Sequence, residues 1–141
     1  MSTDNIVQAC DKGLFTALNV SAVTSLATGG VHNWIAPEET APPFVVFNFV
    51  DNVDSSRSFS PTEKYHTVRY LVKAVTDDGW PKPGQDIQSQ IINLLDRATL
   101  SIENHTFLYC EKVRDVIFSE HVGRERWFHV GAFYDIWADE P

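Results

Sequence analysis

The amino-acid sequence predicts an α+β fold, in which a mostly antiparallel sheet of four to five strands packs against two main helices. Two segments have apolar residues at three- and four-residue spacing, the pattern of a helix with one buried face. Five other segments either alternate between polar and apolar residues or are continuously apolar. Both patterns are typical of β-strands. The chain has 141 residues, a size that suits one domain with one core, so we expect a single domain over residues 1–141.

The first helix is predicted over residues 5–18 and the second after the proline-containing stretch 80–84, continuing to Ala98. The apolar stripe of the first helix consists of Ile6, Cys10, Leu14, Ala17 and Leu18. The stripe of the second helix consists of Ile87, Ile91, Leu94, Leu95 and Ala98. Each helix therefore has one face that needs a sheet to cover it.

The strands are predicted at residues 31–35, 44–50, 65–76, 107–118 and 125–138. Pro42 and Pro43 set the beginning of the second strand, because proline cannot donate a hydrogen bond to a sheet. Residues 119–123 have the length of a hairpin connection between the last two strands. This order of elements gives the mostly antiparallel sheet.

Residues 51–61 are rich in Ser, Asp and Asn and include a proline, so we expect an exposed arm between the second and third strands. Such an arm would bind a partner through Asp51, Asp54, Arg57 and Phe59. The alternative is a loop with no partner.

The final strand is apolar on both faces. Trp127, Phe133 and Trp137 share one face at a period of two residues. The other face carries Phe128, Val130, Tyr134 and Ile136. If both helices cover the same side of the sheet, large aromatic side chains remain on the other side, which is typical of a subunit interface. Alternatively, one helix covers each face of a monomer.

No group of residues predicts catalysis, a metal site or a cofactor. His129 and Asp135 share a face of the last strand, but six residues of strand place them about 20 Å apart, too far for an acid–base pair. The other histidines lack the spacing of metal ligands, and the glycines lack the pattern of a phosphate-binding loop. Cys10 and Cys110 are expected to be buried thiols. The sequence therefore does not predict an enzyme.

The charge and hydropathy exclude two classes of partner. The formal net charge is −8 and no basic run is present, so tight binding to nucleic acid is not expected. No apolar stretch approaches the length of a membrane span, and the first residues do not have the pattern of a secretory signal. We therefore expect a protein without membrane contact that is made in the cytoplasm.

In the order of its elements, the chain resembles the tail completion, or tail terminator, proteins of long-tailed bacteriophages. The segments that carry this resemblance are the helix 6–18, the strand 31–35 with Ala36-Pro37, the stretch Pro42-Pro43-Phe44-Val45-Val46-Phe47, the strand 65–74, the helix 87–95 and the closing strand pair. The resemblance implies a structural virion protein without catalytic residues, assembled in the host cytoplasm. It also implies a ring, a homohexamer, that caps the head-proximal end of the tail tube, contacts the tail tube protein and the head–tail connector, and lets DNA pass without binding it specifically.

Two alternatives remain at this point. A small enzyme or ligand carrier of the NTF2-like type has similar elements, and it would require Tyr109, His129 or Asp135 to converge in a closed apolar pocket. Another head–tail connector or minor tail protein would differ only in its position in the assembly.

Overall fold

The computed structural model describes residues 6–56, 64–102 and 106–139. Within these ranges the chain forms three helices and five strands. In chain order they are α1 (Ile6–Leu18), α2 (Ser21–Thr24), β1 (Val31–Asn33), β2 (Phe44–Ser56), β3 (Lys64–Thr76), α3 (Lys82–Leu95), β4 (Thr106–Val122) and β5 (Glu125–Asp139).

The strands form one sheet with the order β1-β2-β3-β5-β4. β1 is parallel to β2, and every other neighbouring pair is antiparallel. β5, the last strand, inserts between β3 and β4. The predicted α+β class with a mostly antiparallel sheet and two main helices is therefore confirmed.

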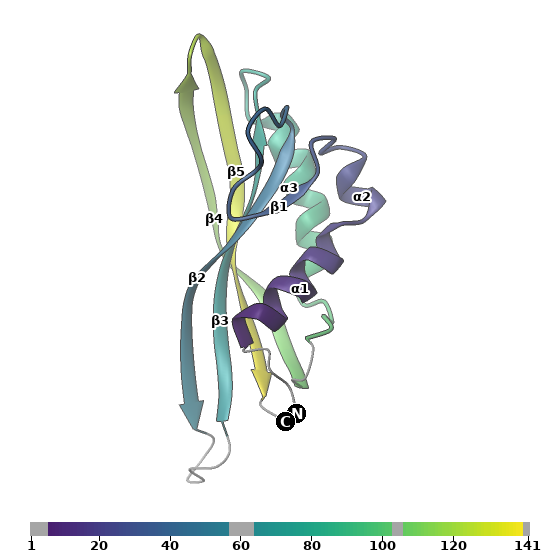
Figure 1. Ribbon diagram of the computed structural model, residues 1–141, viewed down its shortest axis with the longest axis vertical. Coiled ribbons are helices and arrows are strands. Elements are labelled where there is room, and N and C mark those ends of the chain that lie inside the picture. The colour runs from purple at the N-terminus through teal and green to yellow at the C-terminus, as the bar shows by residue number, and fades with distance from the viewer. Residues whose placement is uncertain (1–5, 57–63, 103–105, 140–141) are drawn as a thin grey trace.

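All three helices lie on the same side of the sheet (Figure 1). The apolar stripes of α1 and α3 pack there against alternate residues of the strands, and together they form one core. The strand residues of this core include Val45, Phe47, Val68, Tyr70, Val72, Ala74, Ala132, Tyr134 and Ile136. The arrangement in which one helix covers each face of the sheet is therefore excluded.

Two contacts tie α1 to its surroundings. The buried Tyr70 hydroxyl of β3 donates a hydrogen bond to Asp11 Oδ1 on α1, at 2.5 Å. Gly13 lets the chain after α3 approach the helix, because a Cβ at this position would lie 2.6 Å from the Ser101 carbonyl oxygen. These contacts hold α1 against β3 and against the chain that follows α3.

The structure corrects the predicted boundaries of the arm and of the last hairpin. Residues 51–56, predicted to be a connection, continue β2 and pair with β3 from Asp51↔Arg69 to Ser56↔Lys64. Residues 57–61 of the predicted arm lie outside the described residues. β4 continues through Val122, so the turn to β5 contains only Gly123, with φ of 62°, and Arg124.

The side of the sheet opposite the helices has no helix over it in the described part of the chain, and we call it the open face. It carries the side chains of alternate strand residues. They include Phe44, Val46 and Asp51 of β2; Arg69, Lys73 and Val75 of β3; Tyr109, Arg114, Phe118 and Glu120 of β4; and Trp127, His129, Phe133, Asp135 and Trp137 of β5.

Candidate assembly surface

An apolar cluster occupies one end of the open face. Phe44, Val46 and Val75 are buried there, and Ala36 and Trp127 pack against them. The Phe44 and Trp127 rings meet edge to face, with centroids 6.4 Å apart. The Trp127 indole Nε1 donates to Glu125 Oε2 at 2.8 Å, so its polar end stays at the rim. This cluster is a small second core built without any helix.

A polar group adjoins this cluster around His129. Its Nε2 lies 2.5 Å from Glu120 Oε1, and its ring stacks on Phe118 with centroids 4.4 Å apart. Lys73 Nζ lies 5.4 Å from the centroid of the same Phe118 ring. Burial lowers the pKa of His129 and the pKa of Lys73, in spite of the Glu120 carboxylate that raises both. The His129 ring links the group, because it contacts both the Glu120 carboxylate and the Phe118 ring.

A hollow of about 230 Å³ opens between this apolar cluster and the His129 group. The loop after β1 forms one of its walls, where Trp34 and Ile35 are both exposed. The hollow is lined by Trp34, Ile35, Ala36, Phe44, Val46, Lys73, Val75, Glu120, Trp127 and His129.

Ion pairs and aromatic pairs cover the other end of the open face. The Arg69 guanidinium donates to both oxygens of the buried Asp135 carboxylate, at 2.8 and 3.0 Å. These hydrogen bonds raise the pKa of Arg69 above its usual value. The Trp137 and Tyr109 ring centroids are 5.7 Å apart. The open face is therefore interrupted by charge where Asp135 separates Trp137 from Phe133.

The three aromatic residues predicted on the last strand do share the open face, and each is half-buried. They do not form one patch. Trp127 and Trp137 are ten residues apart on one strand, about 33 Å. Phe133 lies between them under the Arg114 guanidinium, whose central carbon is 4.9 Å from the ring centroid. The predicted interface is thus three separate sites along β5.

The predicted arm residues are only partly placed. Asp51 is exposed on the open face, next to Arg69 in the register of β2 and β3. Asp54 belongs to β2, but its side chain lies outside what the structure describes, as do Arg57 and Phe59. Their role in binding stays a prediction.

Sequence reasoning missed the exposed apolar residues of β4. At least 40% of the surface of each is exposed: Tyr109, Val113, Ile117, Phe118 and Val122. The signal was available, because residues 113–122 have apolar residues in both phases of the strand period, as the last strand does. β4 is the outermost strand of the sheet, whereas β5 lies between two strands. The periodicity of a sequence does not reveal the position of a strand in its sheet.

The residues that an NTF2-like pocket would require do not converge. Tyr109 packs against Trp137 with tilted rings, Asp135 binds Arg69, and His129 binds Glu120, at separate places on the open face. Within residues 6–56, 64–102 and 106–139, no three His, Cys, Asp or Glu side chains lie close enough together to hold a metal ion. None of the described helices has the length and apolar character to span a membrane.

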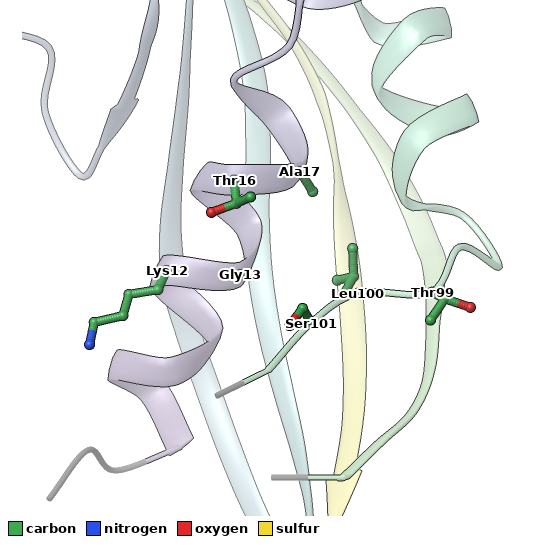
Figure 2. Close-up of a pocket in the computed structure, with 7 residues that line it drawn as sticks. All are labelled: Lys12, Gly13, Thr16, Ala17, Thr99, Leu100 and Ser101. Carbon is green, nitrogen blue, oxygen red and sulfur yellow. The ribbon is translucent and has the colours of Figure 1, made fainter. Parts of the chain in front are cut away.

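A second hollow, of about 480 Å³, lies on the helical side between α1 and the chain after α3 (Figure 2). Among the described residues that line it, Thr16, Thr99 and Ser101 supply side-chain hydroxyls, and Lys12 is the one charged side chain. None of these described lining residues has a carboxylate, imidazole or thiol that would activate a hydroxyl. The lining residues are Lys12, Gly13, Thr16, Ala17, Thr99, Leu100 and Ser101.

Cys10 and Cys110 are both buried and unpaired in the core. Burial raises the pKa of each thiol to about 12, so both remain protonated at neutral pH. They pack as small apolar residues, as the sequence predicted.

A protein-family model described as "Tail completion protein gp17" matches residues 12–139, nearly the whole described chain. The chain belongs to this family. It is therefore a tail completion protein, a structural component of the tail of a phage-like virion and not an enzyme. The match also accounts for a site made of packed aromatic rings and ion pairs instead of converging catalytic groups.

A solved structure has the same fold as this tail completion protein. It is a chain from the "Virion of native gene transfer agent (GTA) particle", with a TM-score of 0.76 and 12% sequence identity. The similarity covers 97% of this chain and 99% of the other. No curated protein sequence matches the chain.

Proposed function

We propose that this tail completion protein closes into a ring, a homohexamer, on the head-proximal end of the tail tube. The ring stops addition of further tail tube protein and presents its other side to the head–tail connector. DNA passes through the ring without specific binding. These roles are the ones that the chain's resemblance to the tail completion, or tail terminator, proteins of long-tailed bacteriophages implies.

The observation that carries this proposal is the open face. A monomer that worked alone would cover both faces of a sheet with so many aromatic residues, because half-buried Trp and Phe side chains gain stability when water is excluded. Here Trp127, Phe133 and Trp137 are left half-buried, and the chain has no described helix to place over them. A second subunit or the tail tube would complete their burial.

The charge of the protein supports passage of DNA over capture of DNA. The net charge is −8, and the basic side chains of the open face are engaged: Arg69 with Asp135, Arg114 over Phe133, and Lys73 over Phe118. Phosphates would gain little from displacing these contacts. A ring of subunits with this charge would therefore let DNA slide through it.

Native mass spectrometry of the purified full chain tests the ring. We expect a single closed species of several subunits, six if the ring is a homohexamer. Its ability to cap is tested by adding it to growing tubes of the tail tube protein encoded with it and measuring tube length by electron microscopy. Labelled protein at one tube end, with arrested growth, is the expected result.

A matched control uses Trp137→Phe and Trp137→Ser, since the first keeps an aromatic ring against Tyr109 and the second does not. Trp137→Phe should still cap tubes. A wild-type protein that remains a monomer at all concentrations and leaves tube length unchanged would contradict the proposed function. Binding to the connector but not to tubes would instead favour another head–tail connector role.

A further inference from the structure

The outer edge of β2 is covered over only part of its length. β1 pairs with β2 from Val31↔Val45 to Asn33↔Phe47, and the last hydrogen bond across this edge runs from the Trp34 N–H to the Phe47 carbonyl, at 2.8 Å. Beyond it, residues 49–56 have no neighbouring strand on that side among the described residues. The Asn52 N–H instead donates to the Asp51 carboxylate at 2.8 Å, which is consistent with an edge that lacks a strand partner.

The outer edge of β4 is likewise covered over only part of its length. The connection from α3 covers its middle, where the Arg97 N–H donates to the Cys110 carbonyl at 2.8 Å. The Lys112 N–H donates to Asp96 Oδ1 at 2.9 Å. Past Lys112, β4 is the last strand of the sheet as far as the structure describes it, so its backbone groups on that side meet no strand.

The direction of these free groups follows from the hairpin. Val122 and Glu125 flank the two-residue turn and therefore form a hydrogen-bonded pair. Because the direction alternates along a strand, the backbone N–H and C=O groups of Asp115, Ile117, Ser119 and His121 point away from β5. They form a regular row of donors and acceptors.

The charged residues on the free part of β4 are engaged within their own subunit: Asp115 with Lys112, Glu120 with His129, and Arg114 over the Phe133 ring. Edges are commonly blocked by charge, proline or short length. β4 has a bulge between Lys112 and Arg114, but the nine residues from Arg114 to Val122 continue without another irregularity. Val113 at the bulge and Ile117, Phe118 and Val122 beyond it are each at least 40% exposed. Such an edge favours addition of a strand from another chain.

We infer that residues 113–122 of β4 pair with residues 49–56 of β2 from a second copy of the chain, in antiparallel orientation. This inference rests on the proposed ring and names the contact that joins its subunits. The two edges are different surfaces on opposite sides of one sheet, which is what a head-to-tail ring contact requires. Each copy would give one of these stretches and receive the other, so neither of the two stretches stays unpaired in a closed ring.

The orientation follows from the sheet. β2 and β4 run in opposite directions within one subunit, because each of the three junctions between them is antiparallel. A rotation about an axis roughly along the strands preserves these directions, so β4 of one copy meets β2 of the next antiparallel. The free parts lie toward opposite ends of the sheet (Figure 1), so neighbours are staggered and the strands are inclined to the ring axis, as in closed sheets.

Cysteine cross-linking of the full chain tests this contact. Asn52 and Ser119 lie on the helical side of their strands with outward-pointing backbone groups, and both accept a cysteine with little change in size. A short bismaleimide should join the double variant Asn52→Cys/Ser119→Cys into a ladder of multimers that ends at the ring. A mixture of the two single variants should give dimers only. The native thiols give little background because they are buried.

Two controls make the ladder specific. Each single variant alone should give no cross-linked product, and Asn52→Cys combined with Ser25→Cys should give none, because Ser25 is exposed at the end of α2 on the helical layer. Dimers from Ser119→Cys alone would mean that β4 pairs with β4, which overturns the inference. Products at the same level with Ser25→Cys would also overturn it.

The result separates this inference from the proposed function. A ring in native mass spectrometry without the ladder overturns the edge pairing and leaves the ring standing. A ladder without a closed species supports the edge pairing and contradicts the ring. Absence of both overturns both.

A proline variant gives a second test. The Ser119 N–H points away from β5, so Ser119→Pro removes a donor only from the edge that a second copy would use. We expect native circular dichroism, an unchanged monomer and loss of the multimers. Phe118→Pro is the matched control, because its N–H points toward β5 and its loss should unfold the hairpin. Multimers that persist in Ser119→Pro at the wild-type level would overturn the inference.

Discussion

Both faces of β5 carry large apolar side chains, but the two faces have different surroundings. On the helical side, Val130, Tyr134 and Ile136 are at most 1% exposed. On the open face, Trp127, Phe133 and Trp137 are each half-buried, although they too are large apolar side chains. The difference lies in what packs over each face, since α1 and α3 cover only one. Residue type along a strand therefore does not determine burial; the neighbouring layer does.

The open face also differs in its polar content. Asp135 and His129 alternate with the aromatic residues of β5, and each has a charged partner on a neighbouring strand, Arg69 and Glu120. No such pair interrupts the apolar residues of β5 under the helices. These pairs keep a half-covered aromatic face compatible with water before assembly, and they divide it into separate contact sites.

Removing a side chain from the covered face should have the largest effect on folding. Ile136 is fully buried between the sheet and the helical layer. Ile136→Ala should lower the free energy of unfolding by about 2–5 kcal/mol, because it removes buried methylene groups and leaves a cavity. Urea denaturation followed by circular dichroism measures this. If Ile136→Ala lowers the free energy of unfolding much less than Trp137→Ser does, the helical face of β5 does not stabilise the fold more than the open face.

Removing the adjacent side chain on the open face should affect assembly more than folding. Trp137→Ser should lower the free energy of unfolding by about 1–2 kcal/mol, since the indole is partly in water already and loses mainly its contact with Tyr109. Light scattering should show loss of the ring. A variant of native ring mass would show that this part of the open face is not an interface.

The sequence was sufficient to predict the elements that face the core. The stripes of α1 and α3 and the alternation Val68, Tyr70, Val72 in β3 are strong because one side of each element is buried. The end of β2 was not predicted, because residues 51–56 are mostly polar and extend past the region that the helices cover. Their backbone pairs with β3, and such pairing leaves no hydrophobic pattern in the sequence.

For the candidate site, the sequence predicted the shared face of Trp127, Phe133 and Trp137 but not their neighbours. Those neighbours come from β3 and β4, and the register of β4 shifts twice along its length. The periodicity of a helix also does not show on which side of the sheet the helix packs. That depends on the order of strands, and β5 inserts between β3 and β4 only through long-range pairing.

Breaking the ion pair that divides the open face should have a smaller effect than either substitution on β5. Arg69→Ala leaves the buried Asp135 carboxylate without its two hydrogen bonds, and should lower the free energy of unfolding by about 1 kcal/mol because water reaches the exposed guanidinium side. Arg69→Ala/Asp135→Asn should recover part of this loss. If the double variant is no more stable than the single variant, the pair does not stabilise the open face.

Protonation of His129 should weaken the open face slightly at acidic pH. Burial lowers its pKa in the folded protein, whereas the unfolded chain takes up a proton at the ordinary value of about 6.5. The unfolded state therefore binds more protons below that pH, so stability falls as the pH decreases from 7 to 5 and is unaffected above it. Denaturation of wild type and His129→Gln across this range should show a shallower pH dependence in the variant. Equal slopes would contradict the assigned shift.

The smallest effect that we expect is the binding of the protein to DNA. The wild type should not shift duplex DNA in a gel at moderate salt, because few phosphate counterions would be released by a chain of net charge −8. The comparison of the two faces sharpens this expectation, since Lys73 and Arg114 are the basic residues of the open face that lie over aromatic rings. A clear shift that Lys73→Ala/Arg114→Ala abolishes would make the open face a DNA-contacting wall instead of a protein contact. A shift that the double variant retains would move DNA contact away from the open face altogether, and the aromatic side chains there would still need a protein to bury them.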